Sequence, residues 1–296
     1  MLSVSVVLAQ WKSENNNMKE RIITGVIMAL VALLAIRFLP SVIFQFALLI
    51  ISLIGVLEWK RMLPEAIRLP YLMCNTILLV IAYLFLFTNT LSLLFIVTAI
   101  AACVWLIVPL LLFLQIKTPQ KWLISKEVTM ILSTIMLLGF YVSLSMLHEL
   151  PGGYGYGLVL YVIGLVALAD SGAYFVGRKL GKNKLAPAIS PGKTIEGAAG
   201  GIVIAMIFSV IVMFFLPASF NGWQKIAFIL MSLIASMLSI AGDLYESLIK
   251  RHAGVKDSGN LFPGHGGVLD RIDGLIAGST FFAFGFYLFQ MNFSAI

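Results

Sequence analysis

Long apolar runs dominate this chain, and charged residues, proline or glycine bound each of them. A helix needs roughly 20 apolar residues to cross the hydrocarbon core of a bilayer, and nine runs approach that length. We expect membrane-spanning helices at residues 22–38, 41–57, 71–88, 91–115, 127–147, 157–176, 198–216, 224–242 and 274–290. A membrane β-barrel would instead show alternating segments of about ten residues. The pattern therefore predicts an all-α, polytopic integral membrane protein with about nine transmembrane helices.

Composition and charge agree with this prediction. Of the 296 residues 60% are apolar and only 11% are charged, whereas a soluble domain carries about 25% charged residues. With nine spans, only Arg37 and Lys225 of the 20 Lys and Arg residues fall on the side opposite the N-terminus. Cytoplasmic connectors carry such an excess, so we expect a multi-pass plasma (inner) membrane protein whose N-terminus and active site are cytoplasmic. The orientation of the protein in the membrane therefore explains the net charge of +7, and we expect no nucleic acid partner.

Three regions follow from the distribution of polar residues. Residues 1–17 lack the positive start of a signal peptide, and we treat them as a dispensable tail. Residues 18–150 form N-terminal transmembrane helices with few polar residues that could bind a substrate or take part in a reaction. In that region we interpret Glu58 as a solvated helix end and His148 as structural or incidental. Residues 151–296 form the C-terminal transmembrane catalytic region.

Acidic residues first appear at the ends of apolar runs from residue 170 onward. Asp170 closes one run, and Tyr174 lies one helical turn later on the same face. A carboxylate near the bilayer centre costs about 2.5–3.5 kcal/mol, and less toward the interface. It therefore normally faces a cavity, a cation or a transport pathway.

A basic, glycine-containing segment follows, from Gly177 to Gly197. Its end resembles a P-loop, but a Walker A motif requires glycine where Pro187 stands, and we expect no β-strand before it. We predict an anion-binding loop, in which Ser190 or Thr194 caps the next helix and leaves backbone N–H groups for phosphate. On composition alone, a topological role or contact with anionic lipid is about as good an explanation. Gly197 and Gly201 have the spacing of close helix packing.

The densest charged segment runs from Asp243 to Asp273. Asp243 ends the eighth span and Asp270 precedes the ninth, so we expect both carboxylates to converge on one cation. Carboxylates that act together with phosphate oxygens suit Mg²⁺, and no Cys/His cluster suggests zinc. His265 is open to three roles, as a ligand, a phosphate donor or a turn residue. Ser247 and His265 do not make a serine hydrolase, because the G-x-S-x-G elbow is missing.

The segment 247–274, SLIKRHAGVKDSGNLFPGHGGVLDRIDG, resembles the signature of the phosphatidate cytidylyltransferases, also called CDP-diacylglycerol synthases. The upstream Asp170 with Tyr174 and the segments 177–178 and 190–194 also resemble that family. The likeness extends loosely from about residue 18 to the C-terminus, with motif-level specificity in 170–274. Ile195 and Gly274 depart from the family pattern at uncharged positions.

The resemblance implies transfer of CMP from CTP to phosphatidate in the membrane, with Mg²⁺ required, alone or with a second cation. Two alternatives stay open: a CTP-dependent transferase with another lipid acceptor, and an ion or lipid transporter. Whether the protein is a homodimer is also open. The residues and the resemblance together assign metal binding to Asp243 and Asp270, and catalysis to Lys250, Arg251, His265, Arg271 and Asp273. They assign substrate binding to Asp170, Tyr174, Arg178, Ser190, Lys193, Thr194, Ser247, Lys256 and Asp257.

Overall fold

A computed structural model describes residues 25–88, 91–117, 119, 121–150, 154–216, 220–262 and 266–293. Eight helices in this part are long and apolar enough to cross a membrane, and a shorter apolar helix spans Gly25–Phe38. The long helices are α2 (Ser41–Trp59), α3 (Glu65–Leu86), α4 (Leu91–Lys117), α5 (Lys126–His148), α6 (Tyr154–Leu180), α7 (Ile195–Met213), α8 (Gly222–His252) and α9 (Leu269–Phe293). The short elements are the 3₁₀ helices Lys60–Met62 and Lys121–Ile124 and the strands β1 (Lys184–Ala186) and β2 (Ser190–Thr194). The chain is an all-α, polytopic membrane protein.

Each predicted run corresponds to one helix, although only the part of the first run from residue 25 onward is described. The largest difference is at α8, which continues to His252 although the apolar run ends at residue 242. The added turns carry polar side chains that pack inside the protein, among them Glu246 and Lys250. An apolar run ends at the first charged residue, but the helix itself can continue where the charged side chains form ion pairs inside the protein.

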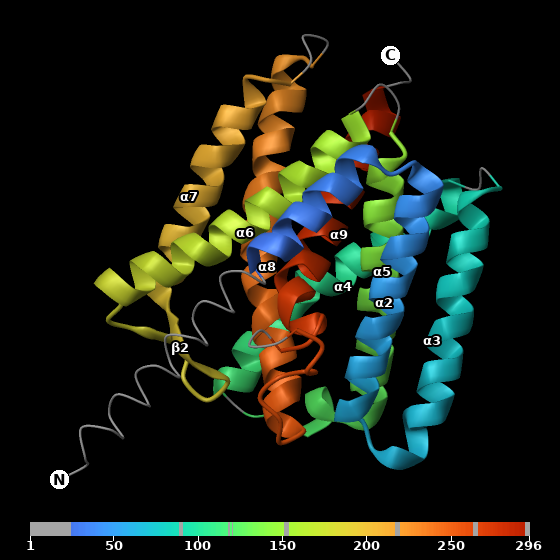
Figure 1. The fold of residues 1–296 in the computed structure, drawn as a ribbon. Coiled ribbons are helices and arrows are strands. Elements are labelled where there is room, and N and C mark those ends of the chain that lie inside the picture. The colour runs from blue at the N-terminus through green and yellow to red at the C-terminus, as the bar shows by residue number, and fades with distance from the viewer. Residues whose placement is uncertain are drawn as a thin grey trace, which may run out of the picture.

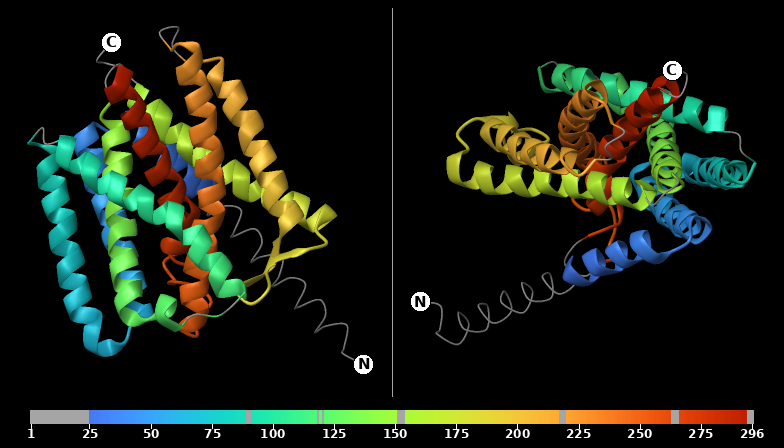
Figure 2. Two further views of the ribbon diagram at one scale, coloured as in Figure 1. Left: turned by 180° about the vertical axis from the view of Figure 1, so that it is seen from behind. Right: turned by 90° about the horizontal axis from the view of Figure 1, so that it is seen from above.

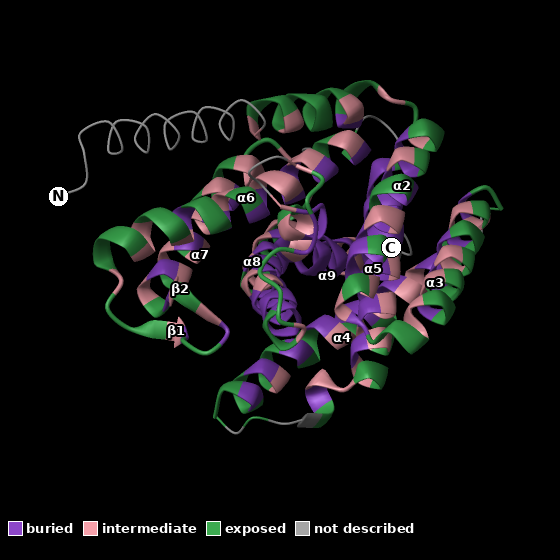
Figure 3. Ribbon diagram, turned by 60° about the horizontal axis from the view of Figure 1, so that its bottom comes forward, coloured by how far each residue is buried: buried purple, intermediate pink, exposed green. Residues whose placement is uncertain are grey.

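The helices form a bundle around α9. Figure 1 shows α9 between α5 and α8, and the view from above in Figure 2 places α4 and α6 on either side of it. Figure 3 shows α9 mostly buried, whereas α3 and α7 lie at the periphery with exposed outer faces. Those faces carry large apolar side chains, such as Met73 on α3 and Ile207 on α7. Lipid would cover these side chains, so the chain is apolar both inside and outside.

Glycines bring α6 and α7 into close contact. A Cβ atom added at Gly201 would collide with the backbone carbonyl oxygen of Ala169, and one at Gly197 would lie 2.7 Å from that of Ala173. Only hydrogen fits at these two positions. The prediction that both glycines allow close packing is confirmed.

A short antiparallel hairpin, β1–β2, joins α6 to α7, and Lys184 pairs with Thr194. The expectation that no strand precedes α7 was wrong, because β2 runs directly into the helix. The P-loop interpretation still fails, because Gly192 and Lys193 lie within the strand and form no loop after it. The carboxylate of Glu196 accepts hydrogen bonds from the backbone N–H groups of Lys182 and Asn183, at 3.1 and 3.2 Å. The hairpin is thus tied to the first turn of α7.

The basic connectors gather at one end of the bundle. In Figure 1 the α2–α3 connection, the start of α5, the hairpin and the α8–α9 connection all lie toward the bottom. At the other end His148, only 8% exposed, stacks on Phe44 with ring centroids 4.0 Å apart. Its Nε2 lies 3.1 Å from the carbonyl oxygen of Ile36. These contacts confirm that His148 is structural.

Candidate active site

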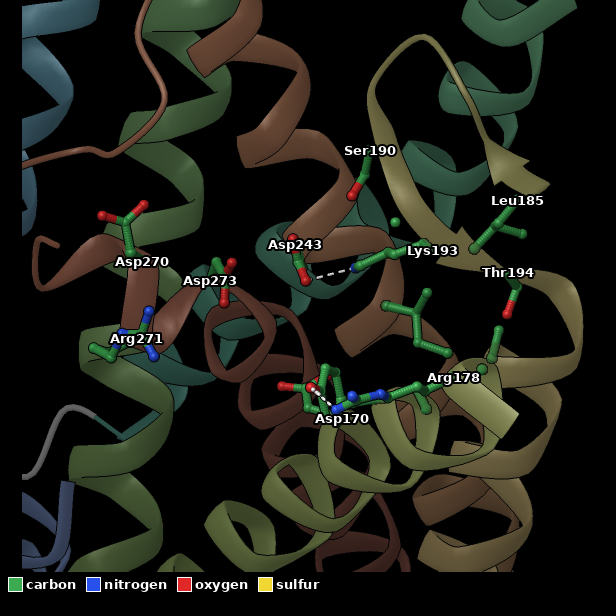
Figure 4. A pocket seen from close by; sticks show the side chains of 16 residues that line it. Asp170, Arg178, Leu185, Ser190, Lys193, Thr194, Asp243, Asp270, Arg271 and Asp273 are labelled. Atoms are coloured by element: carbon green, nitrogen blue, oxygen red, sulfur yellow. Dashed lines mark hydrogen bonds and ion pairs between the residues drawn. The ribbon is translucent and has the colours of Figure 1, made fainter. Parts of the chain in front are cut away.

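A cavity of about 600 Å³ lies where α6, the hairpin, α8 and the start of α9 meet. Figure 4 shows that carboxylates and basic side chains both reach into it. Ten residues predicted from the sequence line this cavity: Asp170, Tyr174, Arg178, Ser190, Lys193, Thr194, Asp243, Asp270, Arg271 and Asp273. The fold therefore brings together charged residues that are up to 103 positions apart, from 170 to 273.

Asp243 stands in the cavity wall with two partners. The ammonium of Lys193, carried by β2, lies 2.5 Å from its Oδ2, and the Ser247 hydroxyl donates to its Oδ1 at 3.2 Å. Both charged side chains remain about one quarter exposed, at 26% for Lys193 and 28% for Asp243. Solvated charges of this kind can exchange partners at low cost. Ser247 contacts Asp243 and is not part of the cavity lining, so its first role in this structure is to orient that carboxylate.

Three carboxylates, those of Asp170, Asp243 and Asp273, line the cavity. Asp273 experiences the negative charges of Asp243, Glu246 and Asp170, and Asp170 experiences that of Asp243. Lys193 and Arg271 oppose this repulsion at Asp170. Like charges lining one cavity favour a bound cation, because a cation relieves their repulsion.

Asp270 is engaged elsewhere. Its Oδ1 lies 2.6 Å from the Lys250 ammonium, and its Oδ2 accepts from the backbone N–H groups of Ser258 and Gly267 at 2.9 and 2.8 Å. Figure 4 shows its carboxylate turned away from Asp243, with Asp273 between the two. This geometry does not support one cation shared by Asp243 and Asp270. Asp273 is in the better position beside Asp243.

Lys250 lies in the protein interior, outside the cavity lining. It is 7% exposed and joins Asp270 to Glu246, whose Oε1 lies 3.2 Å from its Nζ. A cation held between two buried carboxylates is not free to bind a substrate phosphate. In this structure the ammonium of Lys250 pairs with carboxylates, and its phosphate contact stays a prediction.

Three other predicted residues lie on the exposed α8–α9 connection or next to it. Arg251 donates to the carbonyl oxygen of Val255 at 3.3 Å and does not line the cavity. Lys256 and Asp257 are exposed and also lie outside the lining. His265 lies outside the described residues.

Glu58 is the residue whose role the sequence analysis missed. It is 4% exposed, so the expectation of a solvated helix end was wrong. Its carboxylate accepts from the backbone N–H groups of Val268 and Leu269, at 2.9 and 2.8 Å, and from the Ser258 hydroxyl at 2.9 Å. An anion here satisfies free donors at the N-terminus of α9 and interacts favourably with the helix dipole. Glu58 thereby fixes the start of the helix that carries Asp270 and Asp273.

The hairpin side of the cavity combines donors and a helix N-terminus. Thr194 caps α7, because its hydroxyl accepts from the backbone N–H of Gly197 at 3.1 Å. The guanidinium of Arg178 donates to the Tyr174 hydroxyl at 3.3 Å, and Ser190 adds another hydroxyl to the lining. This arrangement offers positive charge and hydrogen-bond donors to an anion. The predicted anion-binding character of the segment is consistent with this geometry.

The carboxylates also fit a hard divalent cation. The described residues contain no group of three or more His, Cys, Asp or Glu side chains arranged to hold a metal alone. Mg²⁺ seldom uses such a cage, and commonly takes one or two carboxylates together with substrate phosphates and water. Asp243 and Asp273 could supply those carboxylates opposite the basic side chains of the cavity.

This set of features, a polar cavity in a helical membrane protein with carboxylates facing basic side chains, is suited to joining phosphorylated substrates. The chain belongs to the cytidylyltransferase family, whose model matches residues 19–289.

Particular relatives narrow the class. The phosphatidate cytidylyltransferase of Haemophilus influenzae is 35% identical over 290 residues, which cover 93% of this chain and 100% of the relative. The enzyme of the same name from Bacillus subtilis is 36% identical over 283 residues, covering 93% and 99%. A third, from Staphylococcus haemolyticus, is 48% identical over 119 residues, covering 40% of this chain and 45% of the relative.

Proposed function

We propose that this protein transfers CMP from CTP to phosphatidate, which yields CDP-diacylglycerol and pyrophosphate for phospholipid synthesis. The observation that carries the proposal is the cavity itself, in which Asp243 and Asp273 share one lining with Lys193, Arg178 and Arg271. One substrate keeps its acyl chains in the bilayer and the other comes from water, so the reaction requires a polar site at the membrane surface. Full-length similarity to the relatives of that name supports this substrate pair over a transporter or another acceptor.

The reaction joins two anions, and its main obstacle is their repulsion. A phosphate oxygen of phosphatidate attacks the α-phosphorus of CTP, and the bond from that phosphorus to the oxygen bridging the α and β positions breaks. Pyrophosphate leaves with the electron pair of that bond. The attacking oxygen is already anionic near neutral pH, so the step needs no strong general base. Catalysis then depends on positioning and on stabilising negative charge.

Residues of this chain can supply both effects. Lys193 and Arg178, on the hairpin side, are placed to hold phosphates, and Arg271 extends the positive charge to the opposite wall. We propose Mg²⁺ as the cofactor, held by Asp243 and Asp273, with Asp270 supporting the site through Lys250 and the backbone. Bound there, the ion would neutralise phosphate oxygens and polarise the α-phosphorus. We also propose that the cavity faces the cytoplasm at the inner membrane, since the basic connectors share its end of the bundle.

The experiment that tests this function is direct. Purified protein is incubated with labelled CTP, phosphatidate and Mg²⁺, and the lipid product is identified by mass. We expect CDP-diacylglycerol, and we expect Asp243→Asn to lower the rate at least ~100-fold, the range for loss of one preorganised charge-stabilising group. Glu65→Gln, which removes an exposed carboxylate outside the cavity, should leave the rate unchanged.

Two results would contradict the proposal. A polyprenyl phosphate that competes successfully with phosphatidate as acceptor would assign the protein to a different lipid. Normal turnover by a folded Asp243→Asn variant would show that this carboxylate neither holds a metal nor organises the site.

A further inference from the structure

A second cavity, of about 310 Å³, lies apart from the first. It is formed by the α2–α3 connection, the start of α5 and the end of α8, and it shares no lining residue with the cavity described above. Its described lining residues are Arg61, Met62, Leu63, Pro64, Arg68, Ile124, Lys126, Thr129, Ile249, His252 and Ala253. This volume falls within the range of small-ligand sites.

Basic side chains dominate the polar part of this wall. Arg61, Arg68, Lys126 and His252 face the cavity, and none of the described lining residues is acidic. Within the described part of the chain the two arginines form no ion pair, and Lys126 has only a 3.7 Å contact with Glu127 on the exposed surface. Positive charge is therefore concentrated here without an internal counter-ion.

The guanidinium of Arg68 is held in place by the backbone. Its Nε donates to the carbonyl oxygen of Leu63 at 2.9 Å, and its Nη2 donates to that of Arg61 at 3.3 Å. A guanidinium has five N–H donors, so these two bonds leave three available. A fixed, planar set of donors suits the oxygens of a phosphate group, because little side-chain entropy is lost on binding.

The helix ends do not add to this preference. The first turns of α3 and α5 carry Glu65 and Glu127, and the Ser125 hydroxyl already caps α5. The C-terminal ends of α2 and α8 also lie at this cavity, so partial charges of both signs are present. The basic side chains alone therefore favour an anion.

We propose that this second cavity binds a phosphate ester anion, at the same end of the bundle as the active site but separate from it. The lining residues flank the ends of α2, α3, α5 and α8, which are helices long and apolar enough to cross a membrane. A glycerophospholipid headgroup and a soluble glycerol phosphate offer the same chemistry to these residues. The site does not depend on the proposed reaction, because it uses none of the residues that line the first cavity.

The test is a binding measurement without CTP or turnover. Purified full-length protein in detergent is titrated separately with phosphatidylglycerol and with soluble glycerol 3-phosphate, and bound molecules are counted by native mass spectrometry. The variant Arg61→Gln/Lys126→Gln removes two exposed cations from the cavity. The matched control Lys117→Gln/Lys179→Gln removes two exposed cations from the ends of α4 and α6, outside both cavities.

We expect the cavity variant to raise the dissociation constant of at least one probe tenfold or more, with less than a threefold change in the control. Loss confined to phosphatidylglycerol would identify a lipid headgroup as the occupant, and loss of glycerol 3-phosphate binding would identify a soluble one. Equal losses in both variants would show general attraction to a basic surface and would overturn the proposal. Unchanged binding of both probes in the cavity variant would overturn it as well.

Discussion

The buried ion pairs of Lys250 allow a sharp distinction between two roles for this residue. The sequence suggested a phosphate contact, whereas the structure places the ammonium 2.6 Å from Asp270 and 3.2 Å from Glu246. The perturbation is Lys250→Met, which keeps much of the apolar stem and removes the charge. If Lys250 binds substrate, this variant is stable but inactive. If Lys250 is structural, the variant is destabilised.

The size of the effect follows from the partners that remain. Asp270 retains two backbone hydrogen bonds, from the N–H groups of Ser258 and Gly267, whereas Glu246 has no partner other than Lys250 among the described residues. The side chain of Glu246 is only 3% exposed, so an unpaired charge would remain in the interior. Breaking a buried pair in this way costs about 3–5 kcal/mol, a large part of the ~5–15 kcal/mol that stabilises a typical native protein.

The assay is unfolding of the purified protein in detergent, followed by intrinsic fluorescence during heating or addition of denaturant. We expect the transition of Lys250→Met to fall markedly, and the double variant Glu246→Leu/Lys250→Met to recover at least half of the loss. The neighbouring exposed substitution Arg251→Met is the control and should shift the transition little. A Lys250→Met protein that unfolds like the wild type would refute the reasoning and restore Lys250 as a candidate substrate contact.

Two further predictions concern packing and capping. Glu58→Gln should destabilise the protein by about 1–3 kcal/mol, because the NH₂ group of the amide cannot accept a hydrogen bond and leaves one backbone N–H donor unpaired. Denaturation measures this change against a Glu65→Gln control, and an unchanged midpoint would contradict the capping role. Gly201→Leu should separate α6 from α7, since even a Cβ atom has no room there; we expect faster proteolysis of the hairpin than with Gly157→Leu, where a Cβ atom meets nothing within 4 Å, and equal rates would argue against tight packing.

Apolar length predicted the helices well because lipid imposes one requirement along the whole chain. Backbone groups in the bilayer must bond within a helix, so a run such as 91–115 has few alternatives, and α4 indeed spans Leu91–Lys117. The apolar run that predicted α8 ends at residue 242, before the end of the helix, because the last turns carry charged residues such as Lys250. Its partner Asp270 is 20 residues away, and no local pattern reveals that pairing.

The chemical residues of the cavity were predictable as a group, but their individual roles were not. Charges at span ends identified Asp170, Asp243 and Asp273, which do meet in one cavity. The sequence could not reveal which of Asp270 and Asp273 turns toward Asp243, because that depends on the orientation of the first turn of α9. The burial of Glu58 could not be predicted for a related reason. Its carboxylate oxygens accept hydrogen bonds from groups some 200 residues later, and the pattern of side chains does not show where backbone N–H donors will lie.

The hydrogen bonds of Glu58 also place a constraint on biosynthesis. The carboxylate and the N–H of Val268 are 210 residues apart, which at ~5–20 residues per second corresponds to roughly 10–40 s of translation. During that interval α2 already carries its acidic end while its eventual partners have not left the ribosome. Water or lipid headgroups must solvate Glu58 until the last span is inserted. The catalytic end of the protein therefore reaches its final form only after the whole chain has entered the membrane, and truncated products lack it.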